Sequence, residues 1–229
     1  MKLSIVIPVY NEENTIDSVL ENVMKVDLEK LGISKEIIVV NDGSNDRTGE
    51  ILDKWKNRVV LLEHRHNSGK GASINTALEK ATGDWVIVQD ADLEYDPQEY
   101  QRLLNPKILN KADIVYGSRF IGSRPHRVLF FWHFMGNRLI TLLCNLFANL
   151  NLSDVETGFK LFRKEAINSI ELKEKDFGFE VEVTLKLAKK KCRFYEVGIS
   201  YYGRDFSEGK KIHWTDGIRA LYLIFKYGI

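Results

Sequence analysis

Residues 86–94 read Val-Ile-Val-Gln-Asp-Ala-Asp-Leu-Glu, an apolar run that stops at two aspartates separated by one alanine. The run predicts a buried strand ending in Asp90 and Asp92, and open α/β sheets bind ligands where such strands end. Two carboxylates this close repel each other unless a cation or a donor-rich ligand lies between them. Oxygen ligands suit Mg²⁺ or Mn²⁺, which bind one or two carboxylates together with substrate phosphates. The stretch indicates a divalent metal holding a diphosphate, although Asp-x-Asp alone would equally mark a strand end and a polar turn.

The first half of the chain alternates predicted strands with predicted helices. Apolar runs rich in β-branched residues predict strands at residues 3–9, 36–41, 59–63, 84–89 and 113–117. Helical periodicity predicts helices at residues 11–26, 45–55 and 68–81. Alternation with short loops implies parallel strands joined by right-handed crossovers. The predicted fold class is therefore α/β, a Rossmann-like, mostly parallel sheet flanked by helices.

The pattern becomes less regular after Gly122. We expect helices at residues 129–148, 179–190 and 213–227, strands at 159–162 and 193–201, and a polar, glycine-containing loop at 202–211. The sequence has no internal repeat, low-complexity tract or linker. A single domain of 229 residues is therefore expected.

The composition is that of an ordinary soluble globular protein, with 44% hydrophobic and 28% charged residues. A formal net charge of +1 argues against a general nucleic-acid binder, which needs a clear basic excess. Cys144 and Cys192 lie far apart without metal-ligand spacing and indicate a reducing compartment. The first apolar run is too short, and broken too early by Pro8, for a signal peptide. No stretch reaches the ~18 apolar residues of a membrane-spanning helix, so a cytoplasmic protein is expected.

Charge is unevenly placed along the chain. Residues 114–153 contain no Asp or Glu but do contain four arginines, Arg119, Arg124, Arg127 and Arg138. Within this segment, residues 128–152 are rich in Leu and Phe and include Trp132. Such a segment is typical of a core helix, and equally of an interfacial helix that lies on anionic lipid.

Two further motifs follow predicted strands and so belong to the same edge of the sheet. Tyr10 and Glu12, in Pro-Val-Tyr-Asn-Glu, are suited to stack on a nucleobase and to accept hydrogen bonds from ribose or base, unless the segment is only a helix cap. Asp42, in Asn-Asp-Gly-Ser, is suited to accept from a base N–H or simply forms an Asp-Gly turn. These residues indicate the base and ribose end of a nucleotide pocket whose diphosphate end is Asp90 and Asp92.

Lys70 lies in the glycine-rich start of a predicted helix, His-Asn-Ser-Gly-Lys-Gly-Ala-Ser, and is a candidate phosphate contact. The Gly-x₄-Gly-Lys-Ser/Thr spacing of a phosphate loop is absent. The Gly-x-Gly-x-x-Gly pattern of a dinucleotide site is also absent after the first strand. A dehydrogenase is thereby nearly excluded.

Three stretches in combination resemble the motifs of inverting glycosyltransferase family 2, whose fold is called GT-A. They read Ser-Ile-Val-Ile-Pro-Val-Tyr-Asn-Glu, Val-Asn-Asp-Gly-Ser-Asn-Asp-Arg-Thr and Gln-Asp-Ala-Asp-Leu. In the second half, Tyr-Gly-Ser-Arg, Asp-Val-Glu-Thr-Gly-Phe-Lys-Leu-Phe-Arg and Gly-Arg-Asp-Phe-Ser-Glu-Gly-Lys-Lys-Ile are similar to the polyprenyl-phosphate glycosyltransferases of that family, such as the dolichol-phosphate mannose synthases. The resemblance covers nearly the whole chain.

The resemblance implies a role for each matching position. It assigns residues 1–118 to nucleotide-sugar binding and residues 119–229 to acceptor binding, with membrane-facing helices. Nucleotide-contacting positions are Pro8, Tyr10, Glu12 and Asp42, and the metal and diphosphate positions are Asp90, Ala91 and Asp92, with Glu94 as a further metal ligand where relatives often have Gln. Arg119 matches an arginine that faces the acceptor phosphate, and Asn137 and Arg138 fall near a Ser-Lys or Ser-Arg pair with the same role. Arg204 and Lys210 match basic residues that close over the donor phosphates.

The predicted function is inverting, Mg²⁺- or Mn²⁺-dependent transfer of a hexose from GDP-mannose or a UDP-sugar to a polyprenyl phosphate, either dolichyl or undecaprenyl. A phosphate acceptor is already an anion and attacks without a strong base, so the expected catalytic residues are Asp92 and the cations Arg119, Arg204 and Lys210. The expected location is the cytoplasmic face of a membrane, bound peripherally or through a separate membrane protein.

Two alternatives stay open. A soluble family 2 enzyme acting on a glycan or other hydroxyl would need a general base, for which Asp154 and Glu156 are the candidates. Those acids would otherwise be solvated turn residues. A catalytically silent, nucleotide-sugar-binding subunit of a membrane assembly is the second alternative, and it would have no need of Asp90, Asp92 and the cationic loop.

Overall fold

The computed structural model describes residues 1–122, 127–128, 130–204 and 214–228. Within these residues, seven strands form one sheet with the order β3-β2-β1-β4-β6-β5-β7. The strands are β1 (Lys2–Val9), β2 (Ser34–Asn41), β3 (Val60–Glu63), β4 (Trp85–Val88), β5 (Ile114–Ser118), β6 (Lys160–Arg163) and β7 (Phe194–Gly198). The predicted α/β class with a mostly parallel sheet is confirmed.

Among the strands of the described residues, only β6 runs against its neighbours. It pairs antiparallel with both β4 and β5, whereas the β1–β2, β1–β4, β2–β3 and β5–β7 pairs are parallel. The reason lies in the connection that precedes it. The chain leaves β5 at Ser118 and enters β6 at Lys160. The backbone N–H of Gly117 donates to the carbonyl of Phe159, so the connection starts and finishes at the same end of these two strands, and β6 must run back along β5.

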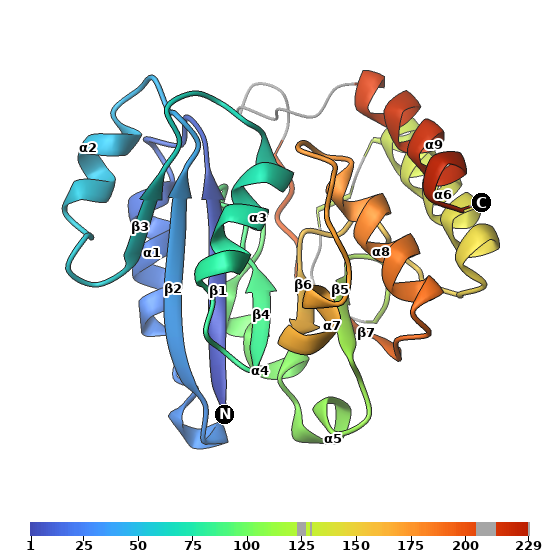
Figure 1. Ribbon diagram of the computed structural model, residues 1–229, viewed down its shortest axis with the longest axis horizontal. Coiled ribbons are helices and arrows are strands. Elements are labelled where there is room, and N and C mark those ends of the chain that lie inside the picture. Colours follow the sequence, from blue (N-terminus) through green and yellow to red (C-terminus); the bar gives the residue numbers. More distant parts are fainter. Residues whose placement is uncertain (123–126, 129, 205–213, 229) are drawn as a thin grey trace.

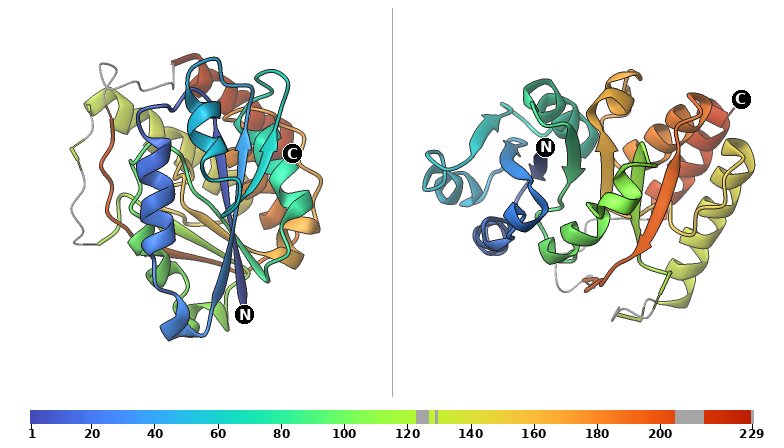
Figure 2. Two further views of the ribbon diagram at one scale, coloured as in Figure 1. Left: turned by 90° about the vertical axis from the view of Figure 1, so that its left-hand side faces the viewer. Right: turned by 90° about the horizontal axis from the view of Figure 1, so that it is seen from below.

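Helices cover both faces of the sheet (Figures 1 and 2). Alternate residues of a strand point to opposite faces, and β1 accordingly sends Leu3, Ile5 and Ile7 into one core and Val6 into the other. The first core is closed by η1 (Glu29–Leu31), α1 (Ile16–Lys25), α2 (Thr48–Asp53), η2 (Pro97–Glu99), α4 (Tyr100–Leu103) and α5 (Pro106–Leu109). The second is closed by α3 (Lys70–Lys80), α6 (Phe131–Ala148), α7 (Lys164–Asn168), α8 (Phe179–Lys189) and α9 (Trp214–Gly228).

Several boundaries differ from those predicted. The helix expected from residue 11 begins at Ile16, because the preceding residues form a turn in which Asn11 has a φ of +50°. The helix expected at 45–55 is shortened to α2. The strand expected at 193–201 ends at Gly198, after which the Ser200 side chain and N–H turn to the Glu99 carboxylate. Short elements η1, η2, α4, α5 and α7 were not predicted.

Helices α6 and α9 lie side by side at one end of the molecule (Figure 1). The ring centroids of Phe147 and Phe225 are 5.3 Å apart. Helix α6 buries Asn137, Ile140 and Thr141 with Cys144 and turns its other side outward. Large apolar side chains lie exposed along the two helices: Phe131, Trp132, Met135, Leu139, Leu142, Leu146, Ile218, Tyr222 and Phe225. Among the described residues, none of the helices combines the length and apolar character needed to cross a bilayer.

Candidate active site

Glu12 lies in the turn between β1 and α1 and is held from two sides. Its backbone N–H donates to the hydroxyl of Thr48 at 2.9 Å. The Thr15 hydroxyl lies 2.7 Å from both Oε2 of Glu12 and the carbonyl oxygen of Ala91. Thr15 therefore ties the turn after β1 to the turn after β4, which brings the first and last of the predicted nucleotide motifs together.

Asp42 is buried at the end of β2, where it organises the loop between β3 and α3. Its Oδ1 lies 2.6 Å from Nδ1 of His64 and accepts the N–H of Ser68 at 2.9 Å, while its Oδ2 accepts the N–H of Gly69 at 2.7 Å. Gly69 has a φ of +98°, a conformation that side chains disfavour. Both carboxylate oxygens of Asp42 are thus engaged, and its predicted contact with a base stays a prediction. Pro8 lies near the end of β1 and Tyr10 directly follows that strand, which neighbours β2 in the sheet.

Asp90, two residues after β4, forms an ion pair with Lys70, the first residue of α3. The Lys70 ammonium group is 2.8 Å from Oδ1 of Asp90 and 3.0 Å from Oε1 of Glu180, at the start of α8. Burial alone would lower the pKa of Lys70, but the two carboxylates raise it well above its usual value. Lys70, which was predicted to contact a phosphate, therefore pairs with two carboxylates in the structure.

Arg204 lies among three acidic side chains at the edge of the sheet. Its Nη2 is 3.3 Å from Oδ2 of Asp92 and 3.3 Å from Oε1 of Glu12, and its backbone N–H donates to Oε1 of Glu94 at 2.7 Å. The Tyr201 hydroxyl donates to Oε2 of Glu94 at 2.8 Å. Arg204 thus joins the segment after β7 to the predicted nucleotide and metal motifs. Lys210, predicted to act with it, lies outside the described residues.

The turn at Asp90–Glu94 is conformationally unusual. Leu93 has a φ of +62°, which bulky residues rarely adopt. The Glu94 N–H donates to Oδ1 of Asp92 at 3.1 Å and closes the turn. Such conformations cost on the order of 1–3 kcal/mol and persist where surrounding contacts enforce them, often at functional sites.

The Asp90 and Asp92 pair fits a hard divalent cation. Burial, and then repulsion from Asp90 and Glu94, raises the pKa of Asp92 to about 7, although Arg204 opposes the shift. An added positive charge would relieve this repulsion. In the part of the chain that the structure describes, no three His, Cys, Asp or Glu side chains gather as a metal site on their own. Further ligands would come from substrate phosphates and water, as is usual for Mg²⁺. The third-ligand role of Glu94 remains a prediction.

Arg119 and Asp154 form a buried, bidentate ion pair. Nε and Nη2 of Arg119 are each 2.7 Å from an oxygen of Asp154, and the Arg119 backbone N–H donates to the same carboxylate at 3.0 Å. The Arg119 guanidinium also lies over the rings of Phe120 and Tyr201. Asp154 is completely buried and bound on both oxygens, so its geometry is that of an orienting partner of Arg119 rather than of an accessible base.

The remaining predicted acceptor residues are separated by helix geometry. Asn137 lies on the buried side of α6, and its Nδ2 has no hydrogen-bond partner among the described residues. Arg138, the next residue, is exposed, with its guanidinium 6.0 Å from the ring centroid of Phe134. The structure therefore does not bring the two together as one phosphate clamp. Glu156 is half-buried, and burial followed by repulsion from Glu180 raises its pKa to about 7.

Sequence reasoning missed two residues that shape this site. Gly158 lies so close to Asp90 that a Cβ would overlap Oδ2 of that carboxylate and crowd the Tyr95 ring. Its N–H donates to the Tyr95 hydroxyl at 2.8 Å. Gly158 lies within the quoted Asp-Val-Glu-Thr-Gly stretch, which offered a signal. Glu180 lies in an apolar-rich helical stretch that offered none.

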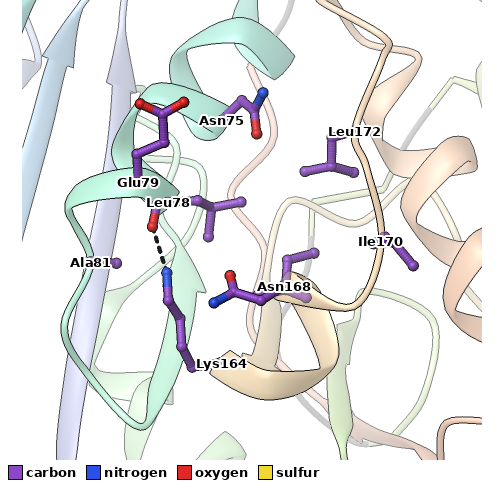
Figure 3. Close-up of a pocket in the computed structure, with 9 residues that line it drawn as sticks. Asn75, Leu78, Glu79, Ala81, Lys164, Asn168, Ile170 and Leu172 are labelled. Carbon is purple, nitrogen blue, oxygen red and sulfur yellow. Dashed lines mark hydrogen bonds between the residues drawn. The ribbon is translucent and has the colours of Figure 1, made fainter.

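A separate hollow of about 440 Å³ lies between α3 and α7 (Figure 3). Its lining is formed by Asn75, Leu78, Glu79, Ala81, Lys164, Ile167, Asn168, Ile170 and Leu172. None of these residues belongs to the motifs above. Lys70 begins α3 at the candidate site, whereas this hollow follows the second half of the same helix.

A family model described as glycosyl transferase family 2 matches residues 4–170. The chain is 32% identical over 218 residues to the low-salt glycan biosynthesis hexosyltransferase Agl6 of Haloferax volcanii, covering 95% of this chain and 51% of that protein. It is 27% identical over 235 residues to a dolichol-phosphate mannosyltransferase of Pyrococcus furiosus, covering 99% and 64%. It is 30% identical over 216 residues to the dolichyl-phosphate beta-glucosyltransferase ALG5D of Trichomonas vaginalis, covering 87% and 65%. The chain thus spans about half to two thirds of the length of these relatives.

Solved structures share the fold. Glucosyl-3-phosphoglycerate synthase from Mycobacterium tuberculosis, in complex with Mn²⁺, UDP and phosphoglyceric acid, superposes with a TM-score of 0.75 at 18% identity, covering 99% of this chain and 78% of that chain. The same enzyme in complex with Mg²⁺ and UDP gives a TM-score of 0.70 at 19% identity, covering 100% and 80%. The likeness establishes the GT-A fold for this chain.

Proposed function

The chain belongs to glycosyltransferase family 2, and on this basis we propose that it transfers a hexose from a nucleotide sugar to a polyprenyl phosphate, with inversion at the anomeric carbon. The observation that carries the lipid acceptor is the exposed apolar side of α6 and α9, which begins beside Arg119. Phe120, the next residue, packs against Phe134 of α6 with ring centroids 5.5 Å apart. The names of two relatives, a dolichol-phosphate mannosyltransferase and a dolichyl-phosphate glucosyltransferase, support the same acceptor class.

The donor would bind along the carboxyl edge of β1, β2 and β4. We assign the base and ribose to Tyr10, Glu12 and Asp42. Asp90 and Asp92 would hold Mg²⁺ or Mn²⁺, which when bound offsets the negative charge of the diphosphate. The complexes of the Mycobacterium enzyme with these ions and UDP support this assignment. Arg204 would turn from its carboxylate partners towards the leaving diphosphate, and we assign the same role to Lys210.

The acceptor phosphate would bind at Arg119. Two of the five N–H groups of the guanidinium go to Asp154, which fixes its plane. We assign the other three, which have no side-chain acceptor among the described residues, to a phosphate. Arg138, on the exposed side of α6, is the second cation that we assign to this end of the site. A phosphate monoester is already an anion at neutral pH, so no proton need be removed before it attacks the sugar.

We assign the exposed side of α6 and α9 to the surface of a membrane. Residues 114–153 contain no acid. Helix α6, which is apolar, has arginines nearby and contains no acid, is suited to the interface of an anionic bilayer, whereas α9 carries Asp216 in its first turn. If this side of α6 and α9 lies on the membrane, the phosphate of a polyprenyl lipid in the bilayer would come close to Arg119. No separate membrane protein is needed for this arrangement.

A transfer assay tests the proposal. Purified protein would be incubated with Mn²⁺ or Mg²⁺, a short-chain polyprenyl phosphate and a panel of radiolabelled GDP- and UDP-sugars. We expect label from one donor to enter the organic phase, and EDTA to stop the transfer. Turnover of no donor with any acceptor would favour the nucleotide-sugar-binding subunit instead.

A hydroxyl acceptor is the second candidate, and Glu156 is the observation that favours it. A carboxyl with a pKa of about 7 is suited to accept a proton at neutral pH. If a hydroxyl is the acceptor, Glu156→Gln would abolish transfer while leaving metal-dependent donor hydrolysis intact. If the acceptor is a lipid phosphate, the same variant would keep transfer to the lipid.

A further inference from the structure

Lys70 occupies a position between two carboxylates from different parts of the chain. Asp90 follows β4, and Glu180 belongs to the first turn of α8, more than one hundred residues away in sequence from Lys70. The Lys70 and Glu180 side chains are 15% and 7% exposed, so water screens the pair weakly. The Lys70 ammonium group is therefore shared between Asp90, at the candidate metal site, and Glu180, which is not part of that site.

Glu180 has more hydrogen-bonding capacity than the structure uses. Its Oε1 faces Lys70, while its Oε2 is buried without a hydrogen-bond partner among the described residues. A buried acceptor without a partner costs on the order of 1–3 kcal/mol. Glu180 therefore has one oxygen on the Lys70 ammonium group and a second oxygen without a hydrogen-bond partner among the described residues.

We propose that Glu180 is a positioning residue that draws Lys70 away from Asp90 when a divalent cation binds there. This inference rests on the proposed function, because it takes Asp90 and Asp92 as the cation's ligands. With the cation bound, Asp90 has a stronger partner than Lys70, and the ammonium group would pair with both oxygens of Glu180. The second oxygen of Glu180 then gains the partner that it lacks in the structure.

The sign of the effect follows from the charges. Without the Glu180 charge, Asp90 would be the remaining carboxylate paired with Lys70, and the ammonium group would compete with the cation for it. Glu180→Gln should therefore weaken cation binding although it changes neither of the proposed metal ligands, Asp90 and Asp92. Glu180→Asp keeps the charge and should retain most of the affinity.

Mn²⁺ binding to the whole chain tests the proposal, with free Mn²⁺ measured by electron paramagnetic resonance in the presence and absence of UDP or GDP. We expect Glu180→Gln to raise the dissociation constant about 10-fold. Glu182→Gln is the matched control, since Glu182 is also buried in α8 but bonds to Lys186 and to the N–H groups of Lys173 and Glu174. This control should lower the melting temperature and leave Mn²⁺ affinity unchanged.

A double substitution shows whether Lys70 carries the effect. In Lys70→Gln/Glu180→Gln the competing ammonium is gone, so Mn²⁺ affinity should return to within about 3-fold of the wild type, a non-additive result for two sites in contact. Circular dichroism melting confirms that each variant is folded before its affinity is compared.

The outcomes separate this inference from the proposed function. Wild-type Mn²⁺ binding with unchanged affinity in Glu180→Gln would overturn the role of Glu180 and leave the proposed function standing. Equal weakening in the single and the double variant would mean that Glu180 attracts the cation directly, which also overturns the mechanism through Lys70. Wild-type protein that binds no Mn²⁺, with or without nucleotide, would overturn both.

Discussion

Asp90 faces Lys70, Asp92 faces Arg204 and Asp154 faces Arg119, each at 3.3 Å or less. Asp42 instead takes backbone N–H groups and an imidazole. At the residue scale, the site is therefore a row of acids whose partners fix them in place before substrate arrives. Charges already held in place stabilise developing charge without reorganisation. Arg119 on Asp154 fits this description, whereas Arg204 and Lys70 would first leave their carboxylate partners.

Asp92→Asn should abolish metal-dependent transfer, lowering turnover by at least about 100-fold, because one of two proposed metal ligands loses its charge. The fold should survive, since the substitution removes repulsion among Asp90, Asp92 and Glu94. Turnover is measured with the lipid acceptor at saturating Mn²⁺. Asp96→Asn is the control, because Asp96 caps η2 through the Gln98 N–H and has no assigned role. Full activity in Asp92→Asn would refute the metal site.

Gly158→Ala should weaken Mn²⁺ binding, because the new methyl group would displace the Asp90 carboxylate or the Tyr95 ring. We expect a loss of affinity of about 10-fold or more, since overpacking costs on the order of 1–3 kcal/mol. Gly136→Ala is the matched control. A Cβ at Gly136, in α6, meets open space, and Ala should stabilise that helix by up to ~1 kcal/mol. Equal Mn²⁺ affinity in both variants would show that the close approach to Asp90 is not needed.

At the scale of elements, three polar side chains of α9 converge on one acid, Glu174, and Arg219 also pairs with Asp176 at 2.7 Å. Glu174, in the segment before α8, accepts from Lys226 at 2.7 Å, from the Tyr227 hydroxyl at 2.6 Å and from Arg219 at 3.0 Å. Burial would raise the pKa of Glu174, but these hydrogen bonds lower it to about 2. The buried side of α9, which carries Ala220, Leu223 and Ile224, also packs on α6 and α8, so the acid adds to that packing rather than replacing it.

The Glu174 contacts predict that part of the free energy of unfolding depends on pH. The folded-state pKa lies below the unfolded value of about 4.3, so the contribution is complete above about pH 4.3 and is lost as the pH falls towards 2. Thermal unfolding of the wild type and of Glu174→Gln should differ most at neutral pH and converge near pH 2. Glu165→Gln, on the exposed side of α7, should track the wild type throughout. A constant difference between wild type and Glu174→Gln at every pH would contradict the assignment.

Periodicity predicted the long elements because their burial is periodic. In α1, Ile16, Val19, Leu20 and Val23 are buried at helical spacing, and β1 is apolar on both faces of a central strand. The short helices α4, α5 and α7 could not be predicted, since four or five residues hold too little of a helical period. The direction of β6 also had no local signal, because it is fixed by where the connection from β5 returns.

At the scale of the whole molecule, the residues at strand ends were predictable and their partners were not. Tyr10, Glu12, Asp42, Asp90 and Asp92 each follow a strand of a parallel sheet, which places them at one edge. Their partners come from distant segments, as with Arg204 beside Glu12 and Glu180 beside Lys70. Such pairings depend on how α8 and the segment after β7 pack against the sheet. The periodicity of a single sequence predicts helices and strands, but it does not predict how they pack.

The apolar side of α6 and α9 predicts binding to anionic vesicles. Trp132 is 83% exposed and Leu146 is 72% exposed on α6. Burying such a side chain in the interface contributes on the order of 1.5–3 kcal/mol, so Trp132→Ala and Leu146→Ala should each weaken binding about 10-fold. Binding is measured by co-sedimentation with phosphatidylglycerol-containing vesicles at low salt, and added salt should weaken it further because the arginines contribute.

Val60→Thr is the control for this experiment, since Val60 is an exposed apolar residue, 44% exposed, on β3 at the other edge of the sheet. It should bind vesicles as the wild type does. Loss of binding in all three variants would point to non-specific adhesion, and unchanged binding in all three would point to a different face. A concentration-dependent dimer that Trp132→Ala and Leu146→Ala dissociate would assign the apolar side to a second copy of the chain, and would leave a lipid phosphate to reach Arg119 without help from the membrane surface.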